Sequence, residues 1–354
     1  MENSEKFLTL SNRKKDILLK SVESYISDGV PVSSNSLIEN HGLTISSASI
    51  RNELNTLEEL GFLKKLHTSG GRVPTTLGYK AFVQSLTSQL PRNAKMLKQI
   101  KDTFLNRSHY LSETIKKVAK VVSDVTNYPA VVLMSGLKNF TIEKIQIVPL
   151  LSGQAFVLIQ TNAGILDPIV LENSEINEKT SLEAGAILTR NFKGLKISDL
   201  VNSAEEASGQ ISQDLKNYET IFKGVVHIVN EYIKSTEKAY SVGATNLLEL
   251  PECETKEDAK RIIDLIEDED KLSEILEPED EEKGIKFKFG ASANNEDVAI
   301  VKTNCALGGV NLAQVAVIGP ERMDYSKIAS ALLFISKEFE SMEKGDSEAS
   351  GKEE

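Results

Sequence analysis

Apolar residues recur at helical spacing in three short stretches near the start of the chain, residues 11–29, 33–42 and 46–61. Each stretch begins at a serine, whose hydroxyl can cap a helix, and ends at a glycine, which can terminate one. The inward-facing positions are Ile17, Leu18, Val22, Tyr25 and Ile26 in the first stretch, Leu37 and Ile38 in the second, and Ile50, Leu54 and Leu57 in the third. This spacing predicts three consecutive helices, the last two joined by a short turn that contains Gly42.

The stretch that follows, residues 62–75, changes to two short extended segments around Gly70 and Gly71. This pattern predicts a β-hairpin with a glycine tip, after which residues 75–86 return to helical spacing. Three helices followed by a hairpin is the order of a winged helix-turn-helix domain, which we assign to residues 1–90. A helical subdomain with an unrelated surface hairpin is the alternative.

The hydrophobic pattern in the rest of the chain predicts an α+β multidomain protein. Residues 91–128 form a helical connector, or a helix that pairs with another. Beyond it the pattern predicts strands in 130–136, 141–151, 154–161 and 164–172, helices in 177–193 and 210–238, an acidic helical segment in 251–283, strands in 284–290, 298–307 and 310–319, and a closing helix from 324. One α+β domain at 129–340 with an inserted element, or two consecutive α+β domains, would give this order. Residues 341–354 have few apolar side chains and predict a disordered acidic tail.

The net charge of −11, from 52 acidic and 41 basic side chains, argues at first against a nucleic-acid partner. The acidity is unevenly distributed, because residues 1–90 hold 10 basic and 9 acidic side chains and the rest of the chain holds 31 and 43. The N-terminal end is therefore nearly neutral and can face DNA, while the acidic remainder stays in solvent.

The third helix presents small and amide side chains on the face opposite its apolar stripe. That outer face holds Ala48, Ser49, Asn52 and Asn55, with Arg51 at its edge. Asparagine can pair with adenine, and arginine with guanine, through two hydrogen bonds each, so this face is suited to base edges in the major groove. Ser46, Ser47 and the amide groups of the first turn are suited to phosphate. An ordinary solvated surface is the alternative.

The hairpin supplies positive charge beside this helix. Lys64, Lys65, His67 and Arg72 flank the two glycines, which would let a phosphate strand come close to the backbone. We predict that these four side chains contact DNA phosphates. A surface hairpin with scattered positive charge is the alternative.

Other function classes find little support in the sequence. The chain has no Walker A, G-x-S-x-G, H-E-x-x-H or paired Cys-x-x-Cys pattern, so we expect no enzyme activity, cofactor or metal site. Cys253 and Cys305 are far apart, which is typical of thiols in a reducing, cytoplasmic protein. No signal peptide or membrane-spanning apolar run is present, so we expect no membrane association.

Several short motifs follow one another in the N-terminal part of the chain. Between residues 31 and 83 the chain reads "PVSS", "SSASIRNEL", "LEELG", "HTSGGRVP" and "GYKAFV". These resemble, in the same order, the motifs P-V-G-S, S-x-A-T-I-R-N-E-M, L-E-x-x-G, H-T-S-A-G-R-I-P and G-Y-R-x-Y-V of HrcA, the family of bacterial heat-inducible transcription repressors. Further on, "VGATNLLELPE" and "VIGPERMDYSKI" resemble V-G-G-T-x-N-L-L and G-P-T-R-M-D-Y-x-x-V. Gly70, Ser49, Glu321 and the run "FKFGASANNEDV" depart from the family pattern.

The resemblance implies a homodimeric repressor built from a winged-helix domain, a GAF-like domain and an inserted dimerisation domain. Its partners would be the inverted-repeat CIRCE operator upstream of chaperone operons and the chaperonin GroEL, which promotes the DNA-binding form. A palindromic operator calls for a two-fold dimer. A regulator that senses a ligand through the GAF-like domain, or a winged helix that binds protein or RNA, are the alternatives.

The turn "GPERMDY", residues 319–325, admits two interpretations. Gly-Pro can end a strand, and Asp324 can cap the closing helix with Tyr325 packed beneath it. Arg322 would then belong to a salt-bridged structural turn. A regulatory or domain-docking role is the alternative.

Overall fold

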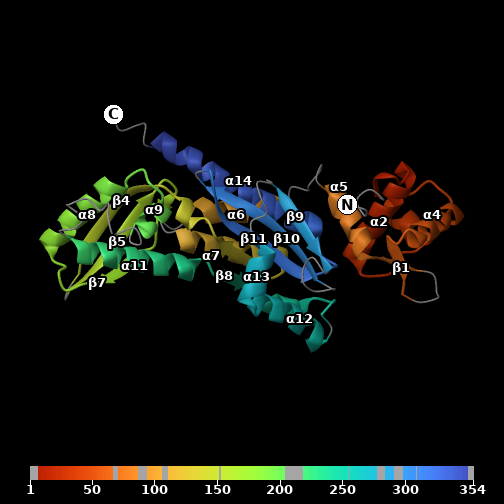
Figure 1. Cartoon of the computed structure of the whole chain (residues 1–354). Helices are drawn as coiled ribbons and strands as arrows, with labels where there is room; N and C mark the ends of the chain where they lie inside the picture. The colour runs from red at the N-terminus through yellow and green to blue at the C-terminus, as the bar shows by residue number, and fades with distance from the viewer. Residues whose placement is uncertain are drawn as a thin grey trace.

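The computed structural model describes the chain except for residues 1–6, 67–70, 87–93, 106–110, 151–152, 204–217, 254, 277–283, 291–297, 308 and 350–354. The molecule is elongated, and three bodies follow one another along its length (Figure 1). The N-terminal body lies at one end, a body built on a five-stranded sheet lies in the middle, and a body built on a four-stranded sheet lies at the other end.

The N-terminal body has the helices and the hairpin that the sequence predicts. Its elements are α2 (Asn12–Asp28), α3 (Ser34–His41), α4 (Ser47–Glu59), β1 (Leu63–Lys65), β2 (Arg72–Pro74) and α5 (Thr76–Leu86). The hydroxyls of Ser11, Ser33 and Ser46 accept hydrogen bonds from the first turns of α2, α3 and α4. β1 and β2 are antiparallel, and Val32 forms two backbone hydrogen bonds with Arg72. The segment between α2 and α3 therefore adds a bridge to the hairpin.

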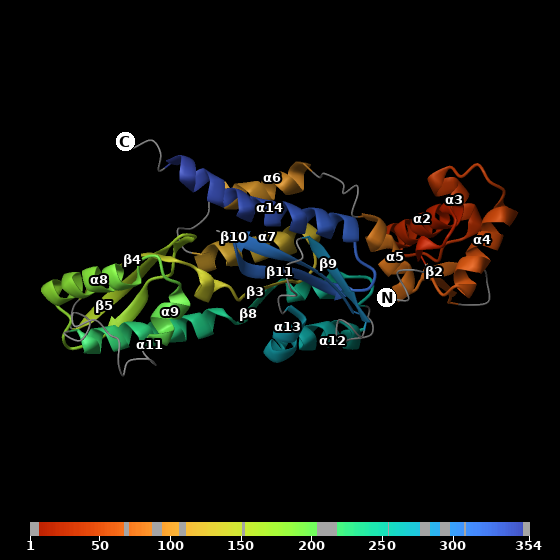
Figure 2. The ribbon, with the colours of Figure 1, turned by 45° about the horizontal axis from the view of Figure 1, so that its top comes forward.

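The central body is one antiparallel sheet with helices on both faces. Its strands are β3 (Ala130–Met134), β8 (Ala239–Val242), β9 (Ile285–Phe289), β10 (Val298–Leu307) and β11 (Val310–Pro320), in the spatial order β8-β3-β11-β10-β9. Its helices are α6 (Ala94–Leu105), α7 (Leu111–Thr126), α12 (Lys256–Glu267), α13 (Glu269–Leu276) and α14 (Tyr325–Ala349), with the short turn η2 (Ala244–Glu249). The other short turn, η1 (Leu137–Asn139), follows β3 and belongs to the four-stranded body. The helices α6, α7 and α14 cover one face and α12 and α13 the other (Figure 2). Burial of both faces explains why the central strands read as continuous apolar runs.

β3 pairs with β8 and β11 although the four-stranded body lies between β3 and β8 in sequence. β3, which precedes the four-stranded body in sequence, and β8 to β11, which follow it, therefore belong to one sheet. At the other end of the chain, α14 continues to Ala349, into the tail predicted to be disordered.

The third body is formed by the residues between β3 and β8. Its elements are β4 (Ile142–Pro149), β5 (Gln154–Thr161), β6 (Gly164–Ile165), β7 (Ile169–Glu172), α8 (Glu178–Phe192), α9 (Ile197–Asn202) and α11 (Glu219–Thr236). β5 pairs with the other three strands. α8 packs on β4 and α11 on β7.

Candidate nucleic-acid interface

The helix α4 buries one side and exposes the other. Ile50, Leu54 and Leu57 are at most 1% exposed, so the apolar stripe fixes how the helix rotates on the core. Arg51 and Asn52 are exposed on the far side, and neither side chain has a hydrogen-bond or ion-pair partner among the described residues. Both side chains are free to contact a ligand that approaches this face.

Two serines predicted to contact DNA are instead engaged at the start of α4. The Ser47 hydroxyl lies 2.9 Å from Ser34 Oγ and donates to Asn35 Oδ1 at 2.9 Å, which ties α4 to α3. Ser49 accepts a hydrogen bond from the capping hydroxyl of Ser46 at 3.0 Å. Asn35 is exposed beside them and is a further candidate for a DNA contact that was not among the predicted residues. Its position in the first turn of the capped helix α3 is the sequence feature that could have indicated it.

Arg72 is buried, which corrects the expectation that it lies on the hairpin surface. It is 4% exposed, and its Nε donates to Glu58 Oε2 at 3.0 Å. Its Nη2 donates to the amide oxygen of Asn55. Arg72 therefore clamps the hairpin to α4 and fixes the orientation of the Asn55 amide. The sequence around Arg72 does not indicate this burial, because its acidic partner Glu58 lies on a different element, the helix α4.

Glu58 stays charged at this junction. Partial burial acts to raise its pKa, but the hydrogen bonds from Lys65 and Arg72 outweigh burial and hold the pKa below its ordinary value. Lys65 Nζ lies 3.1 Å from the same carboxylate oxygen that accepts from Arg72. Two cations thus surround one carboxylate, which offsets the repulsion it would exert on a nearby phosphate.

Lys64 and Lys65 face opposite sides of β1, because successive side chains in a strand alternate. Lys65 borders a hollow of about 700 Å³ together with Arg51 and Asn55. Lys64 lines a different hollow, of about 310 Å³, between the N-terminal body and the central body. Lys64 therefore does not share a surface with α4. His67 and Gly70 lie outside the described residues.

Comparison with known proteins identifies the family. The family model "HrcA protein C terminal domain" matches residues 112–329. Two proteins named "Heat-inducible transcription repressor HrcA" are each 31% identical to the chain, one from Acetivibrio thermocellus over 92% of the chain and 94% of the relative, the other from Brevibacillus brevis over 91% and 95%. The chain belongs to the HrcA family. Members of the family are heat-inducible repressors, so membership places this chain among regulators of transcription.

A solved structure agrees with the fold. It is described as a hypothetical protein, and it aligns with 94% of this chain and 99% of its own length at a TM-score of 0.65 and 19% identity. The likeness extends over all three bodies of this HrcA family member. The α+β, multidomain organisation predicted from the sequence is thereby confirmed.

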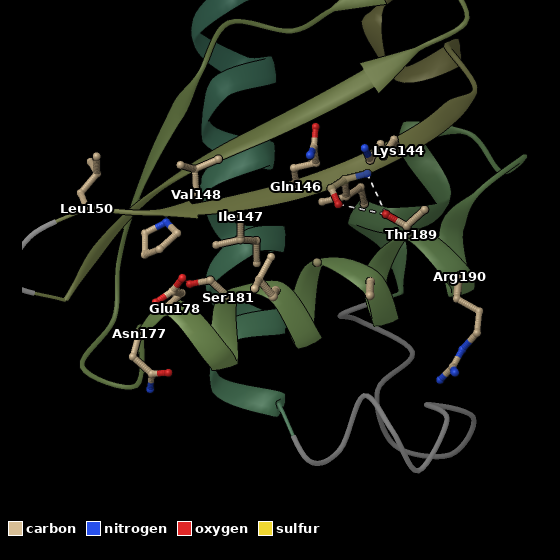
Figure 3. A pocket seen from close by; sticks show the side chains of 15 residues that line it. Lys144, Gln146, Ile147, Val148, Leu150, Asn177, Glu178, Ser181, Thr189 and Arg190 are labelled. Atoms are coloured by element: carbon tan, nitrogen blue, oxygen red, sulfur yellow. Dashed lines mark hydrogen bonds between the residues drawn. The ribbon is translucent and has the colours of Figure 1, made fainter.

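The largest hollow described in this HrcA family member lies on the four-stranded body. It measures about 1130 Å³ and runs between β4 and α8. Ile147 points toward α8, Val148 and Leu150 lie on the opposite side of the strand, and Asn177, Glu178 and Arg190 lie toward the ends of the hollow (Figure 3). The Thr189 hydroxyl is bound to both backbone groups of Ile145 and is not offered to a ligand.

The described residues include no group of His, Cys, Asp and Glu that could hold a metal ion. Within the same residues, no helix is both long and apolar enough to cross a membrane. Cys253 and Cys305 are buried free thiols, and burial raises the pKa of both.

Proposed function

We propose that this chain is a DNA-binding repressor of heat-shock operons, which encode chaperones and chaperonins, and that it binds an inverted-repeat CIRCE-type operator as a homodimer. The observation that carries the proposal is the exposed edge of α4, where the side chains of Arg51 and Asn52 have no partner among the described residues and Arg51 borders the same hollow as Lys65. Arginine and asparagine read guanine and adenine, and lysine holds phosphate. Family membership supports the repressor role.

The arrangement supports a division into functional domains. The N-terminal body serves as a winged helix-turn-helix, with α4 as recognition helix and β1–β2 as wing. The five-stranded body serves as a GAF-like domain within residues 129–340, and the four-stranded body is its inserted dimerisation domain. Within residues 91–128, α6 and α7 connect the N-terminal body to the GAF-like domain and also cover one face of its sheet.

The apolar surface of the inserted domain supports the dimer. Leu182 is 66% exposed beside the hollow on α8, and Val148 and Leu150 are each about 40% exposed. Burying such a patch against a second copy would favour association. A chaperonin such as GroEL that binds the folded repressor would stabilise the DNA-binding form by mass action, and heat stress that diverts the chaperonin would release the operator.

Asn52→Ala tests base reading by α4. We expect the affinity for the inverted repeat to fall about 10- to 100-fold for each of its two half-sites, because each bidentate base contact contributes about 1–3 kcal/mol of discrimination. The affinity for scrambled DNA should change little. Electrophoretic shifts with labelled operator, competed by each unlabelled duplex, give both values. An equal loss on both duplexes would place Asn52 at the DNA backbone. Wild-type protein that binds both equally would contradict operator recognition altogether.

Lys65→Ala and Lys64→Ala form a matched pair that tests which face of the hairpin meets phosphate. We expect Lys65→Ala to lower the slope of log affinity against log salt by about two on the inverted repeat, because each protomer of the dimer loses one phosphate contact and each contact releases about one counterion. The slope should not change for Lys64→Ala, since Lys64 lines the hollow between two bodies. Fluorescence anisotropy titrations between 50 and 200 mM salt, roughly the range over which such contacts are resolved, provide the slopes. A change with Lys64→Ala alone would reverse the assignment.

A further inference from the structure

Three segments that are far apart in the sequence meet where the N-terminal body joins the central body. They are the last turn of α2, the turn that contains Glu252, and the turn at residues 319–325. The last two belong to the stretches "VGATNLLELPE" and "GPERMDY". Asp324 Oδ1 caps α14 by accepting from the Lys327 amide at 3.0 Å, as the sequence predicts. This cap explains the role of Asp324, whereas the role of Arg322 follows from its own contacts.

Arg322 binds the end of α2. Its Nε donates to the Tyr25 carbonyl and its Nη2 to the Ile26 carbonyl, each at 2.9 Å. Its guanidinium carbon lies 5.7 Å from the centre of the Tyr25 ring. The last carbonyls of a helix carry its negative partial charge, so a cation is favoured there. The Tyr25 carbonyl also accepts from the Gly29 amide at 3.0 Å. A planar guanidinium bonds to the Tyr25 and Ile26 carbonyls at once, which the single ammonium of lysine cannot do in the same geometry.

The central body holds the same guanidinium from the other side. Arg322 Nη1 forms an ion pair with Glu252, and both side chains are only 18% exposed. Nearby, the Thr76 hydroxyl of α5 donates to Glu321 Oε1 at 2.6 Å. The ring centres of Tyr79 on α5 and Tyr325 are 5.9 Å apart. The ends of two N-terminal helices therefore dock on one turn, and Arg322 is its charged centre.

The helix α2 connects the Arg322 contact to the recognition helix α4. Glu53 of α4 lies 3.4 Å from Arg13 and 3.1 Å from Lys14, both on α2. The two helices also pack against each other. A rotation of α2 on the central body would therefore carry α4 with it. In a dimer, the same rotation would change the spacing of the two recognition helices.

We propose that Arg322 is a positioning residue for operator binding, which fixes the direction of α4 relative to the dimerising part of the chain. The proposal rests on the proposed operator function. Two half-sites of an inverted repeat lie at one spacing, and a dimer binds both only when its recognition helices match it. A loosely held N-terminal body would lower the effective concentration at the second half-site without changing contacts at the first.

The chain offers a matched pair of glycines for a test that leaves Arg322 itself in place. Gly29 and Gly42 both end a helix in the left-handed region, at φ 69° and 60°, and both amides bond to a carbonyl four residues back. A Cβ on Gly29 would lie 3.0 Å from both Nη atoms of Arg322, whereas a Cβ on Gly42 meets nothing within 4 Å. Gly29→Ala and Gly42→Ala therefore cost similar backbone strain, and only Gly29→Ala disturbs the guanidinium.

The first measurement uses full-length wild type, Arg322→Met, Arg322→Lys, Gly29→Ala and Gly42→Ala. Each is titrated with a single half-site duplex and with inverted repeats whose spacer is varied by a few base pairs. We expect Arg322→Met to lose at least about tenfold in affinity at the preferred spacer, to bind all spacers similarly, and to bind the half-site within roughly twofold of wild type. The affinities and spacer preferences of Arg322→Lys and Gly29→Ala should be intermediate between those of wild type and Arg322→Met. Gly42→Ala should keep the wild-type dependence of affinity on spacer length. A wild-type spacer profile in Arg322→Met would overturn the proposal.

The second measurement contains no DNA, so it decides about Arg322 even if operator binding itself fails. Spin labels are attached at the exposed positions of Glu39→Cys on α3 and Lys260→Cys on α12, in chains diluted with unlabelled protein. The interdomain distance distribution is expected to be narrow in wild type and Gly42→Ala, and broad in Arg322→Met. Equal widths in all three would contradict the positioning role. Wild-type protein that does not prefer the inverted repeat over scrambled DNA, together with a broadened Arg322→Met distribution, would refute the operator function and retain the docking.

Discussion

Replacing Arg72 by Met is expected to destabilise the N-terminal body by about 2–3 kcal/mol and to remove operator binding with it. Loss of one partner from a buried ion pair typically costs about 3–5 kcal/mol, and the partial exposure of Glu58 lowers the expected value. Asn55 would also lose the donor that orients its amide. Since the chain has no tryptophan, amide hydrogen exchange in α4 is the suitable measurement, with exchange about 30- to 150-fold faster expected.

Lys64→Met is the control for this variant, because Lys64 is an exposed lysine on the neighbouring strand. Its effect on stability should stay within about 0.5 kcal/mol. A stable Arg72→Met variant whose only defect is a smaller salt slope would show that Arg72 contacts phosphate after all.

Lowering the pH should weaken the contact between Glu58 and Arg72. The pKa of Glu58 is lowered in the folded chain, so its stabilisation is present above the ordinary glutamate pKa of about 4.3 and is lost as the pH falls through the lowered value. Arg72→Met removes one of the two donors. The difference in α4 exchange between wild type and this variant should therefore shrink as the pH is lowered below about 4.3.

Gly78→Ala should also have a large effect, although it adds only one methyl group. A Cβ at this position of α5 would overlap the backbone carbonyl oxygen of Phe62, which cannot move without displacing β1. We expect a loss of about 2–3 kcal/mol in the N-terminal body, as for other overpacked sites, and weaker operator binding because the wing shifts. Hydrogen exchange in α4 and β1, together with operator affinity, would measure both.

Gly224→Ala on α11 is the matched control. It is also a helical glycine, but its added Cβ would meet only the flexible end of Leu171, at 2.8 Å. We expect Gly224→Ala to change the free energy of unfolding little, because the helix propensity of alanine, better than that of glycine by about 1 kcal/mol, offsets the contact with Leu171. Equal stability of Gly78→Ala and wild type would mean that the hairpin adapts to the added group.

The local elements could be read from the sequence because the residues that build them are neighbours along the chain. Ser11, Ser33 and Ser46 cap the first three helices, and Gly29 and Gly42 end two of them, since each interaction spans only three or four residues. The outward direction of Arg51 and Asn52 was also predictable. It follows from the helical period once Ile50, Leu54 and Leu57 are assigned to the core.

What the sequence by itself determined is therefore the set of elements, their caps, the exposed edge of α4 and the family motifs. Only the tertiary structure decided that Arg72 is clamped to Glu58, that Lys64 faces away from α4, and that Arg322 reaches the end of α2. Glu58 lies 14 residues from Arg72, and Tyr25 lies 297 residues from Arg322. No periodicity encodes such a pairing, because the partner of a long charged side chain is set by which elements pack together, and that depends on the burial of the whole chain.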